Sequence, residues 1–182
     1  MTRSLKSDSY LEIGDILRKI YDSIYHRPMN FSFIDNYVCG SARIMSKQDI
    51  DWLKLKGVKA VLALTETAIP SSWVEASGIE YKHVPVKNHT SPSIEQLDDC
   101  VNFIERIGRE GKKTLVHCAA GKGRTGTVLA AYLCEHNDIS AETAIEQVRT
   151  KRGGSIENDP ESGQENVVIE FCQILHKKKK SA

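Results

Sequence analysis

The sequence predicts an α/β fold with a mostly parallel central sheet flanked by helices. Three observations support this prediction. Short β-branched runs alternate with amphipathic helical patterns along the chain, as in a parallel sheet covered by helices. Residues 58–64 are almost continuously apolar, which is typical of a strand buried on both faces. Residues 114–117 lead into a glycine-bearing loop and then a helical segment, a geometry that directs backbone N–H groups at a small anion.

An amphipathic helix is predicted at the N-terminus, over about residues 9–25. Its apolar residues recur at helical spacings and are Leu11, Ile16, Leu17, Ile20 and Ile24. The helix precedes the segments that form the sheet, so we interpret residues 1–27 as an N-terminal helical extension of a main domain, residues 28–176. Docking of the helix on this domain is favoured over a role as a partner surface.

Residues 28–92 are expected to contribute three strands and two helices. Ser46 is placed to cap a helix that continues to Lys56, and Gly57 is placed to end it. The other expected elements are a strand over residues 37–39 that ends at Gly40, strands over 58–64 and 79–84, a turn at 69–72 into a short helix, and a loop over 85–92.

The rest of the chain is expected to be mainly helical. Ser93 and Ser140 are placed to cap two helices, which end near Arg109 and Arg152. The other expected elements are a strand over residues 114–117, helices over 126–136 and 164–176, and a basic tail over 177–182 that contains four lysines. Such runs of charge at a terminus are usually solvated.

Composition indicates a single globular domain without a strong electrostatic preference. The 182 residues are 40% apolar and 27% charged, with a net charge of +1, and a chain of this length can bury its own core. These values give no general attraction to nucleic acid or to a membrane. The N-terminus lacks the apolar core of a signal peptide, and no apolar stretch approaches the ~20 residues that span a bilayer.

Five cysteines are scattered along the chain without CxxC spacing: Cys39, Cys100, Cys118, Cys134 and Cys172. This pattern argues against a disulfide framework or a zinc site. Apart from Cys118, most of them lie in apolar or helical runs, where packing is the expected role. We therefore expect a reduced, cytoplasmic protein.

The loop after residue 117 combines a phosphate cradle with a nucleophile. Residues 116–127 read VHCAAGKGRTGT, so Cys118 begins the loop and Arg124 follows six positions later. The planar guanidinium of Arg124 can bind two phosphate oxygens at once. Converging N–H dipoles and a helix N-terminus should make the Cys118 thiol ionise more readily than a free cysteine. A buried, inert cysteine is the alternative, but three loop glycines, His117 and Thr125 favour a thiolate aimed at phosphorus.

These residues match the signature H-C-x-x-G-x-x-R-[ST] of the cysteine-dependent phosphatases at every fixed position. Residues 30–34, 64–66, 84–85 and 154–157 extend the resemblance to the small atypical dual-specificity and protein-tyrosine phosphatases, over roughly residues 28–175. The resemblance implies a phosphocysteine intermediate on Cys118 and a transition state stabilised by Arg124. It implies that Thr125 eases departure of the thiolate and that His117 supports the loop. It also implies that no metal or organic cofactor is needed.

The same resemblance assigns the remaining positions of the site. Phosphate would be bound by the loop residues Ala119, Ala120, Gly121, Lys122, Gly123 and Arg124. The aspartic acid that protonates the leaving group in the family would fall at Asn88, and an amide cannot donate a proton usefully. His89 and Glu157 are the candidates to replace it, because imidazolium titrates near neutral pH and residues 154–157 are expected beside the site. Gln164 would orient the attacking water.

The function predicted from these features is hydrolysis of protein phosphotyrosine, with phosphoserine or phosphothreonine as further substrates. One alternative keeps the mechanism but takes a phosphoinositide or an RNA 5′-phosphate, which Lys122 and the basic tail would favour. A second alternative is a catalytically weak phosphate-binding module, because the acid position holds Asn88. The expected partner is a phosphorylated protein, with no nucleic acid and no membrane insertion, and a monomer is favoured.

Overall fold

The computed structural model describes the backbone of residues 4–157 and 161–180, with side chains from residue 13 onward. A five-stranded sheet has the order β1-β2-β5-β3-β4. The strands are β1 (Ser32–Phe33), β2 (Val38–Ser41), β3 (Val58–Ala63), β4 (Glu80–His83) and β5 (Lys113–His117). Only β1 is antiparallel to its neighbour, β2, among these strands. The predicted mostly parallel α/β sheet is confirmed.

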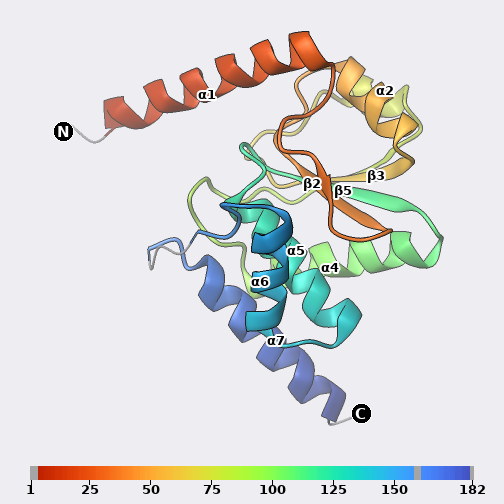
Figure 1. The fold of residues 1–182 in the computed structure, drawn as a ribbon, viewed down its shortest axis with the longest axis vertical. Helices are drawn as coiled ribbons and strands as arrows, with labels where there is room; N and C mark the ends of the chain where they lie inside the picture. The colour runs from red at the N-terminus through yellow and green to blue at the C-terminus, as the bar shows by residue number, and fades with distance from the viewer. Residues whose placement is uncertain (1–3, 158–160, 181–182) are drawn as a thin grey trace.

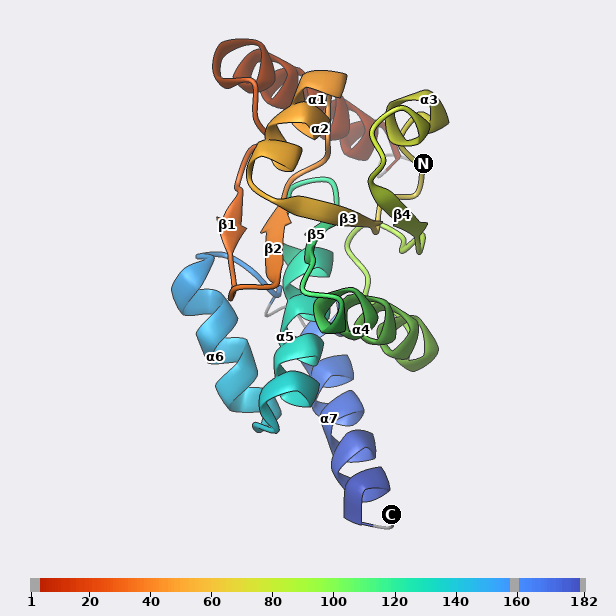
Figure 2. The same cartoon turned by 90° about the vertical axis from the view of Figure 1, so that its right-hand side faces the viewer.

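Helices cover both faces of the sheet (Figure 2). α2 (Lys47–Leu55) and α3 (Ser71–Glu75) lie on one face. The other face carries α4 (Ile94–Arg109), α5 (Gly123–Asn137), α6 (Ala141–Lys151) and α7 (Gln164–Lys180). Alternate side chains of the buried strands enter the two cores, so that Leu62 of β3 packs towards the larger helical layer and Val61 towards α2. No helix in the described part of the chain is both long and apolar enough to cross a membrane.

The strand register brings the ends of three strands together beside the predicted phosphate loop. His117, the last residue of β5, lies opposite Ser41 of β2 and Ala63 of β3. Parallel strands present their carboxyl ends at one edge of the sheet, where α/β proteins usually bind ligands. The loops that follow β2, β3 and β5 are therefore neighbours.

The three predicted serine caps are confirmed. The hydroxyl oxygens of Ser46, Ser93 and Ser140 each accept a hydrogen bond from the backbone N–H three residues later, at 3.2, 3.2 and 3.3 Å respectively. Ser93 also takes part in a capping box with Gln96. Gly57 follows α2 with a φ of 82°, a conformation that glycine adopts without steric cost. Local signals thus located these helix ends.

Several elements differ from the sequence prediction, and β1 was not expected. Gly40 lies inside β2 and does not end it; glycine is needed there because a Cβ atom would lie 2.9 Å from Cζ of Arg152. α5 begins at Gly123 and not at Gly126. Residues 177–180 form the last turn of α7 and not a separate tail, and Lys179 pairs with Asp138 at 2.7 Å. The remaining tail residues, 181–182, lie outside the described part of the chain.

α1 (Ser4–Tyr25) is longer than predicted and crosses one end of the molecule, away from α6 and α7 (Figure 1). Its polar face contacts the domain: an Asp15 carboxylate oxygen lies 3.6 Å from Nη1 of Arg43, and Asp22 accepts a hydrogen bond of 3.1 Å from Ser46. The described apolar residues of the prediction face solvent instead, and they are Ile16, Leu17, Ile20 and Ile24. The helix therefore contacts the domain through its polar face, while these four apolar residues are exposed; docking as the role of the helix stays a prediction, and the side chain of Leu11 lies outside the described ones.

The contact between α1 and α2 should make stability depend on pH through Asp49. Burial and the neighbouring Asp22 carboxyl raise the pKa of Asp49 from 3.8 to about 7. The folded protein therefore holds this proton more tightly than the unfolded chain does. Its contribution, up to about 4 kcal/mol, is complete below pH 3.8 and is lost as the pH rises towards 7.

We expect Asp49→Asn to flatten the fall in the free energy of unfolding across this range, because an amide stays neutral and can still donate to Asp22. Urea unfolding of both proteins at several pH values between 4 and 8 measures the effect. Parallel profiles for the two proteins would show that Asp49 is ionised at neutral pH in the folded state.

Candidate active site

The loop from Cys118 to Lys122 joins β5 to α5. Its carbonyl oxygens accept hydrogen bonds from residues outside the loop. The hydrogen bonds run from Arg43 N–H to Ala119 (3.1 Å), from Asn30 Nδ2 to Ala120 (2.8 Å) and from Arg152 Nη2 to Gly121 (2.6 Å). In a trans peptide the following N–H points the opposite way from the carbonyl. The amides of residues 120–122 therefore point away from these partners, as required of groups that surround an anion.

Two of the loop glycines are required by close contacts. Gly121 has a φ of 71°, and a Cβ atom there would lie 2.4 Å from the backbone of Ser41 and Ala42. Gly123 begins α5, and a Cβ atom there would lie 2.7 Å from the side-chain nitrogen of Gln164. The loop is therefore packed against β2 on one side and against the start of α7 on the other.

Cys118 lies at the bottom of a cavity of about 320 Å³ and is itself only 3% exposed. Three segments besides the loop contribute to the cavity wall. The lining residues outside residues 118–124 are Gly14 and Arg18 from α1, Asn88 and His89 from the loop after β4, and Gly154, Glu157 and Gln164. The structure thus brings the sequence-predicted residues Cys118, Arg124, Asn88, Glu157 and Gln164 to one place.

Arg124 is buried, and hydrogen bonds from both terminal nitrogens of its guanidinium fix its position. Nη1 donates to the carbonyl oxygen of Val86 at 2.6 Å and to a Glu66 carboxylate oxygen at 3.0 Å. Nη2 donates to Oδ1 of Asn88 at 2.8 Å. The hydrogen bonds described for Arg124 leave from these two nitrogens, so the Nε–H and the second Nη2–H, which share an edge, remain to bind two phosphate oxygens.

Asn88 lies at the cavity, at the position where the resemblance would place the proton donor, and its side chain binds Arg124. Its side-chain oxygen accepts from Arg124, and its backbone N–H donates to Glu66 at 2.7 Å. Burial raises the pKa of Glu66, but hydrogen bonds from backbone N–H groups and Arg124 outweigh this and hold it below its ordinary value. Glu66 was not singled out as a site residue from sequence, although it lies in the segment 64–66 that carried the resemblance.

The two candidate proton donors lie together at the cavity wall. Nδ1 of His89 is 3.6 Å from Oε1 of Glu157. The φ of His89 is 59°, a left-handed conformation that costs a residue other than glycine on the order of 1–3 kcal/mol and that clusters at functional sites. Gln164, 1% exposed, accepts a hydrogen bond from the backbone N–H of Glu157 at 2.8 Å. The structure therefore places a histidine–carboxylate pair and a glutamine around the cavity.

His117 is completely buried beneath the loop. Burial lowers the pKa of its imidazole to about 3, so the ring is neutral. Neither ring nitrogen meets the geometry of a hydrogen bond to a described residue, although the backbone of Cys118 opposes the lowering of the His117 pKa. The role of His117 in supporting the loop stays a prediction. The hydroxyl of Thr125 is also buried without a described partner, which leaves it able to donate to a sulfur or phosphate atom.

Arg152 is a functional residue that sequence reasoning missed. Besides Gly121, its guanidinium donates to the carbonyl oxygen of Gly40 at 2.8 Å and to Ser32 Oγ at 2.5 Å. It therefore ties the phosphate loop to β1 and β2. Burial lowers its pKa, while the neighbouring Cys118 and Cys39 raise it, so its positive charge lies close to the nucleophile. The sequence marked Arg152 only as a helix end, and its long-range contacts leave no local signal.

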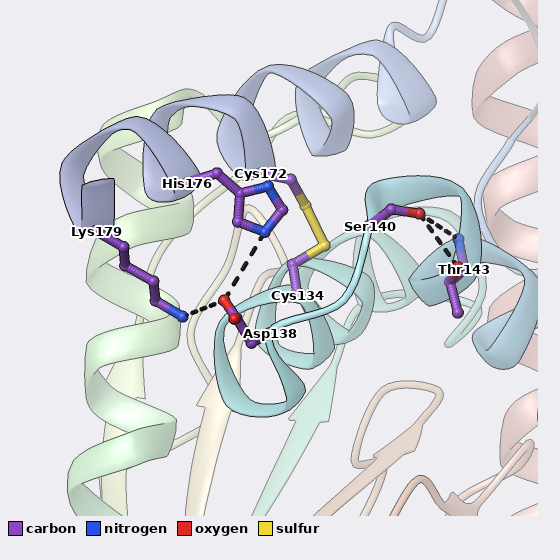
Figure 3. The surroundings of a disulfide bond; sticks show 7 residues. All are labelled: Cys134, Asp138, Ser140, Thr143, Cys172, His176 and Lys179. Atoms are coloured by element: carbon purple, nitrogen blue, oxygen red, sulfur yellow. Dashed lines mark hydrogen bonds and ion pairs between the residues drawn. A yellow bond between two sulfur atoms is a disulfide. The ribbon is translucent and has the colours of Figure 1, made fainter. Parts of the chain in front are cut away.

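Two of the cysteines form a disulfide that the sequence analysis did not expect (Figure 3). Cys134 of α5 bonds to Cys172 of α7, which lies 38 residues further along the chain. The prediction that they only pack is wrong because it relied on short spacing, whereas α5 and α7 lie against each other in the fold. The predicted cytoplasmic location stays a prediction.

Cys118 should be the most reactive thiol of the protein. Burial raises the pKa of Cys39 and of Cys100 to about 12, and Cys134 and Cys172 are bonded. We expect iodoacetate at pH 6 to label Cys118 first, and we expect inorganic phosphate to protect it because phosphate would occupy the loop. Mass spectrometry of tryptic peptides measures the order of labelling, and equal labelling of Cys39, Cys100 and Cys118 would contradict it.

The fold and the site together define the class of protein as a cysteine-dependent phosphatase of the dual-specificity type. The family model for the dual specificity phosphatase catalytic domain matches residues 37–165. The chain therefore belongs to this family of phosphoric monoester hydrolases.

Comparisons with individual proteins divide between lipid and protein phosphatases. The chain is 36% identical over 145 residues to phosphatidylglycerophosphate phosphatase PTPMT2 of Arabidopsis thaliana, covering 78% of this chain and 62% of that protein. It is 30% identical over 128 residues to dual specificity protein phosphatase 6 of Homo sapiens, covering 70% and 32% respectively. It thus spans less than two thirds of these relatives. The crystal structure of Tk-PTP in the active form aligns with a TM-score of 0.71 and 35% identity, covering 79% of this chain and 97% of that one.

Proposed function

We propose that this protein hydrolyses the phosphate monoester of an anionic lipid headgroup, of the class to which phosphatidylglycerophosphate belongs. This is the lipid alternative of the sequence analysis, and it replaces phosphotyrosine as the favoured substrate. The similarity to a phosphatidylglycerophosphate phosphatase supports it. The observation that carries it is the composition of the cavity wall.

The residues that line the cavity suit a polar headgroup better than an aromatic ring. None of the described lining residues is Phe, Tyr or Trp, so a phosphotyrosine ring would find no aromatic side chain to stack on. Lys122 lines the same cavity and is exposed, which places a cation at its rim. A headgroup that carries a second phosphate, esterified to the lipid, would gain an ion pair there.

The proposed reaction has two steps at the Cys118 sulfur. The thiolate attacks phosphorus, the bond from phosphorus to the headgroup oxygen breaks, and that oxygen takes a proton. Water then attacks the phosphocysteine, releases inorganic phosphate and restores the thiolate. The Nε and Nη2 edge of Arg124 and the loop amides hold the equatorial oxygens in both steps. Thr125 donates to the departing sulfur, and Gln164 orients the water.

An alkyl headgroup makes the proton donor essential, because an alkoxide is a much poorer leaving group than a phenolate. Asn88 cannot supply the proton, since its side chain is an amide bound to Arg124. We assign this role to His89, with Glu157 holding the imidazolium in place at 3.6 Å. The left-handed backbone at His89, a residue that lines the cavity, fits this role because such strained conformations cluster at functional sites.

His89→Ala should lower kcat for an alkyl phosphate by about 10²-fold or more and should change the rate for a nitrophenyl phosphate much less. Glu157→Gln should act in the same direction with a smaller effect. Equal losses on both substrates would mean that His89 has a structural role only.

The substrate class is tested by comparing kcat/KM for phosphatidylglycerophosphate in mixed micelles, a phosphotyrosine peptide and a 5′-phosphorylated RNA oligonucleotide. We expect the lipid to be preferred by at least 10²-fold over both. Lys122→Ala should reduce kcat/KM for the lipid and should affect nitrophenyl phosphate little. A preference for the peptide or the RNA would overturn the lipid proposal. If no substrate were turned over, the protein would instead be interpreted as a phosphate-binding module.

A further inference from the structure

The outward face of α1 is the most apolar exposed surface among the described residues. Large apolar side chains lie along this face over four turns of the helix. They are Ile13, Ile16, Leu17, Ile20, Ile24 and Tyr25, each between 51% and 62% exposed. Isolated exposed apolar residues need no explanation, but an aligned stripe on one helix marks an interaction surface.

The charges of α1 are sorted between its two faces. Between residues 13 and 25 both carboxylates turn inward: Asp15 pairs with Arg18 at 2.6 Å and Asp22 accepts from Ser46. The exposed charged residue of this segment is Lys19, which flanks the apolar stripe. Just beyond the helix, the Arg27 guanidinium lies 5.8 Å from the ring centre of Tyr25. The apolar stripe is therefore accompanied by cations and an aromatic ring, and the carboxylates are turned away from it.

The inward face of the same helix belongs to the candidate active site. Gly14 and Arg18 line the cavity that contains Cys118. Figure 1 shows α1 crossing the end of the molecule opposite α7. Whatever the apolar stripe lies against is therefore one helix diameter, about 10 Å, from the opening of the cavity.

We propose that the outward face of α1 lies in the interfacial layer of an anionic lipid bilayer and holds the cavity beside its substrate headgroups. The inference rests on the proposed lipid substrate. A helix with an apolar face, flanking Lys or Arg and an interfacial aromatic residue binds in the plane of a membrane without spanning it. A second copy of the chain is the alternative occupant of this face, and the test below distinguishes it from a membrane.

The proposal is tested by sedimentation with vesicles that contain no substrate. Vesicles of phosphatidylcholine, with and without 30% phosphatidylglycerol, are mixed with the catalytically inactive Cys118→Ser protein. The test variant adds Ile16→Ser, Leu17→Ser and Ile20→Ser. The matched control adds Leu55→Ser, which removes an apolar side chain that is 85% exposed on α2 and is not part of the α1 stripe. The same changes in the wild-type background are assayed with nitrophenyl phosphate to verify folding.

We expect the control to bind anionic vesicles as the parent does and the test variant to bind at least 10-fold more weakly. Weaker binding of the parent to pure phosphatidylcholine would support the role of Lys19 and Arg27. Equal binding of test variant and control, or no binding of the parent, would overturn the proposal. So would a dimer in light scattering that the three α1 substitutions dissociate, because the stripe would then be an interface between copies.

The outcome separates this inference from the proposed function. Vesicle binding without turnover of phosphatidylglycerophosphate would refute the substrate and leave the membrane surface in place. Turnover of that lipid in detergent micelles without vesicle binding would refute the membrane surface and leave the substrate in place.

Discussion

Cys118→Ser should abolish turnover of every phosphate monoester, with a loss of at least about 10⁴-fold in kcat. A serine hydroxyl is far less acidic than a thiol, and no hydrogen bond joins the buried His117 ring to the side chain at position 118 to activate it. Phosphate binding should persist, since Arg124 and the loop amides are unchanged. Steady-state rates measure the first effect, and calorimetry with inorganic phosphate or vanadate measures the second.

The wild-type protein provides the complementary observation. Rapid acid quenching during turnover should trap a phosphate on the peptide that contains Cys118, and Cys118→Ser should yield none. Substantial activity in the serine variant, or a phosphate trapped on another residue, would refute the proposed nucleophile. Cys39→Ser is a suitable control, because it removes a buried thiol that lies outside the cavity.

Arg124→Lys should lower kcat by about 10² to 10³-fold and should also weaken phosphate binding. Lysine offers a point charge where the guanidinium edge binds two oxygens. The substitution also removes the hydrogen bonds to Val86 and Asn88, which fix the loop after β4 against the phosphate loop. Arg124 helps to lower the pKa of Glu66. In the variant, Glu66 would lose this guanidinium partner, and its carboxylate would compete with phosphate for the ammonium group of the lysine.

Asn88→Ala is the matched control for this prediction. It removes the partner of one Nη2 proton and leaves the Nε and Nη2 edge in place, so the loss in kcat should be clearly smaller than in Arg124→Lys. Rates for Arg124→Lys close to those of the wild type would show that the phosphate binds elsewhere in the cavity. Comparable losses in the two variants would show that Arg124 acts mainly by holding the loop after β4.

Features written in short stretches of sequence could be predicted, and features that depend on distant contacts could not. Ser46, Ser93 and Ser140 cap their helices because a cap involves only the next three residues. The strand, loop and helix around Cys118 could be predicted for the same reason. The disulfide and the role of Arg152 depend on how helices and strands pack. The spacing of residues along the chain does not indicate this packing.

The N-terminal helix shows a different limit of sequence reasoning. The periodicity of its apolar residues correctly indicated a helix and an apolar face. It could not indicate the direction of that face, because an amphipathic pattern is the same for a helix that packs on its own domain and for one that packs on something else. An ion pair from Asp15 to Arg43 and a hydrogen bond from Ser46 to Asp22 orient the helix, and both partners lie more than twenty residues away in sequence.

The disulfide between α5 and α7 places two opposed redox requirements in one chain. The proposed mechanism requires Cys118 as a reduced thiolate, whereas Cys134 and Cys172 must be oxidised to form their bond. The two requirements are separated by access: both disulfide residues are no more than 2% exposed, while Cys118 opens into the cavity. A small thiol that enters the cavity can therefore regenerate an oxidised Cys118 while the buried cross-link stays intact. Closing a loop of this length is worth about 3–4 kcal/mol, so the scaffold would keep its cross-link through cycles of inactivation and recovery.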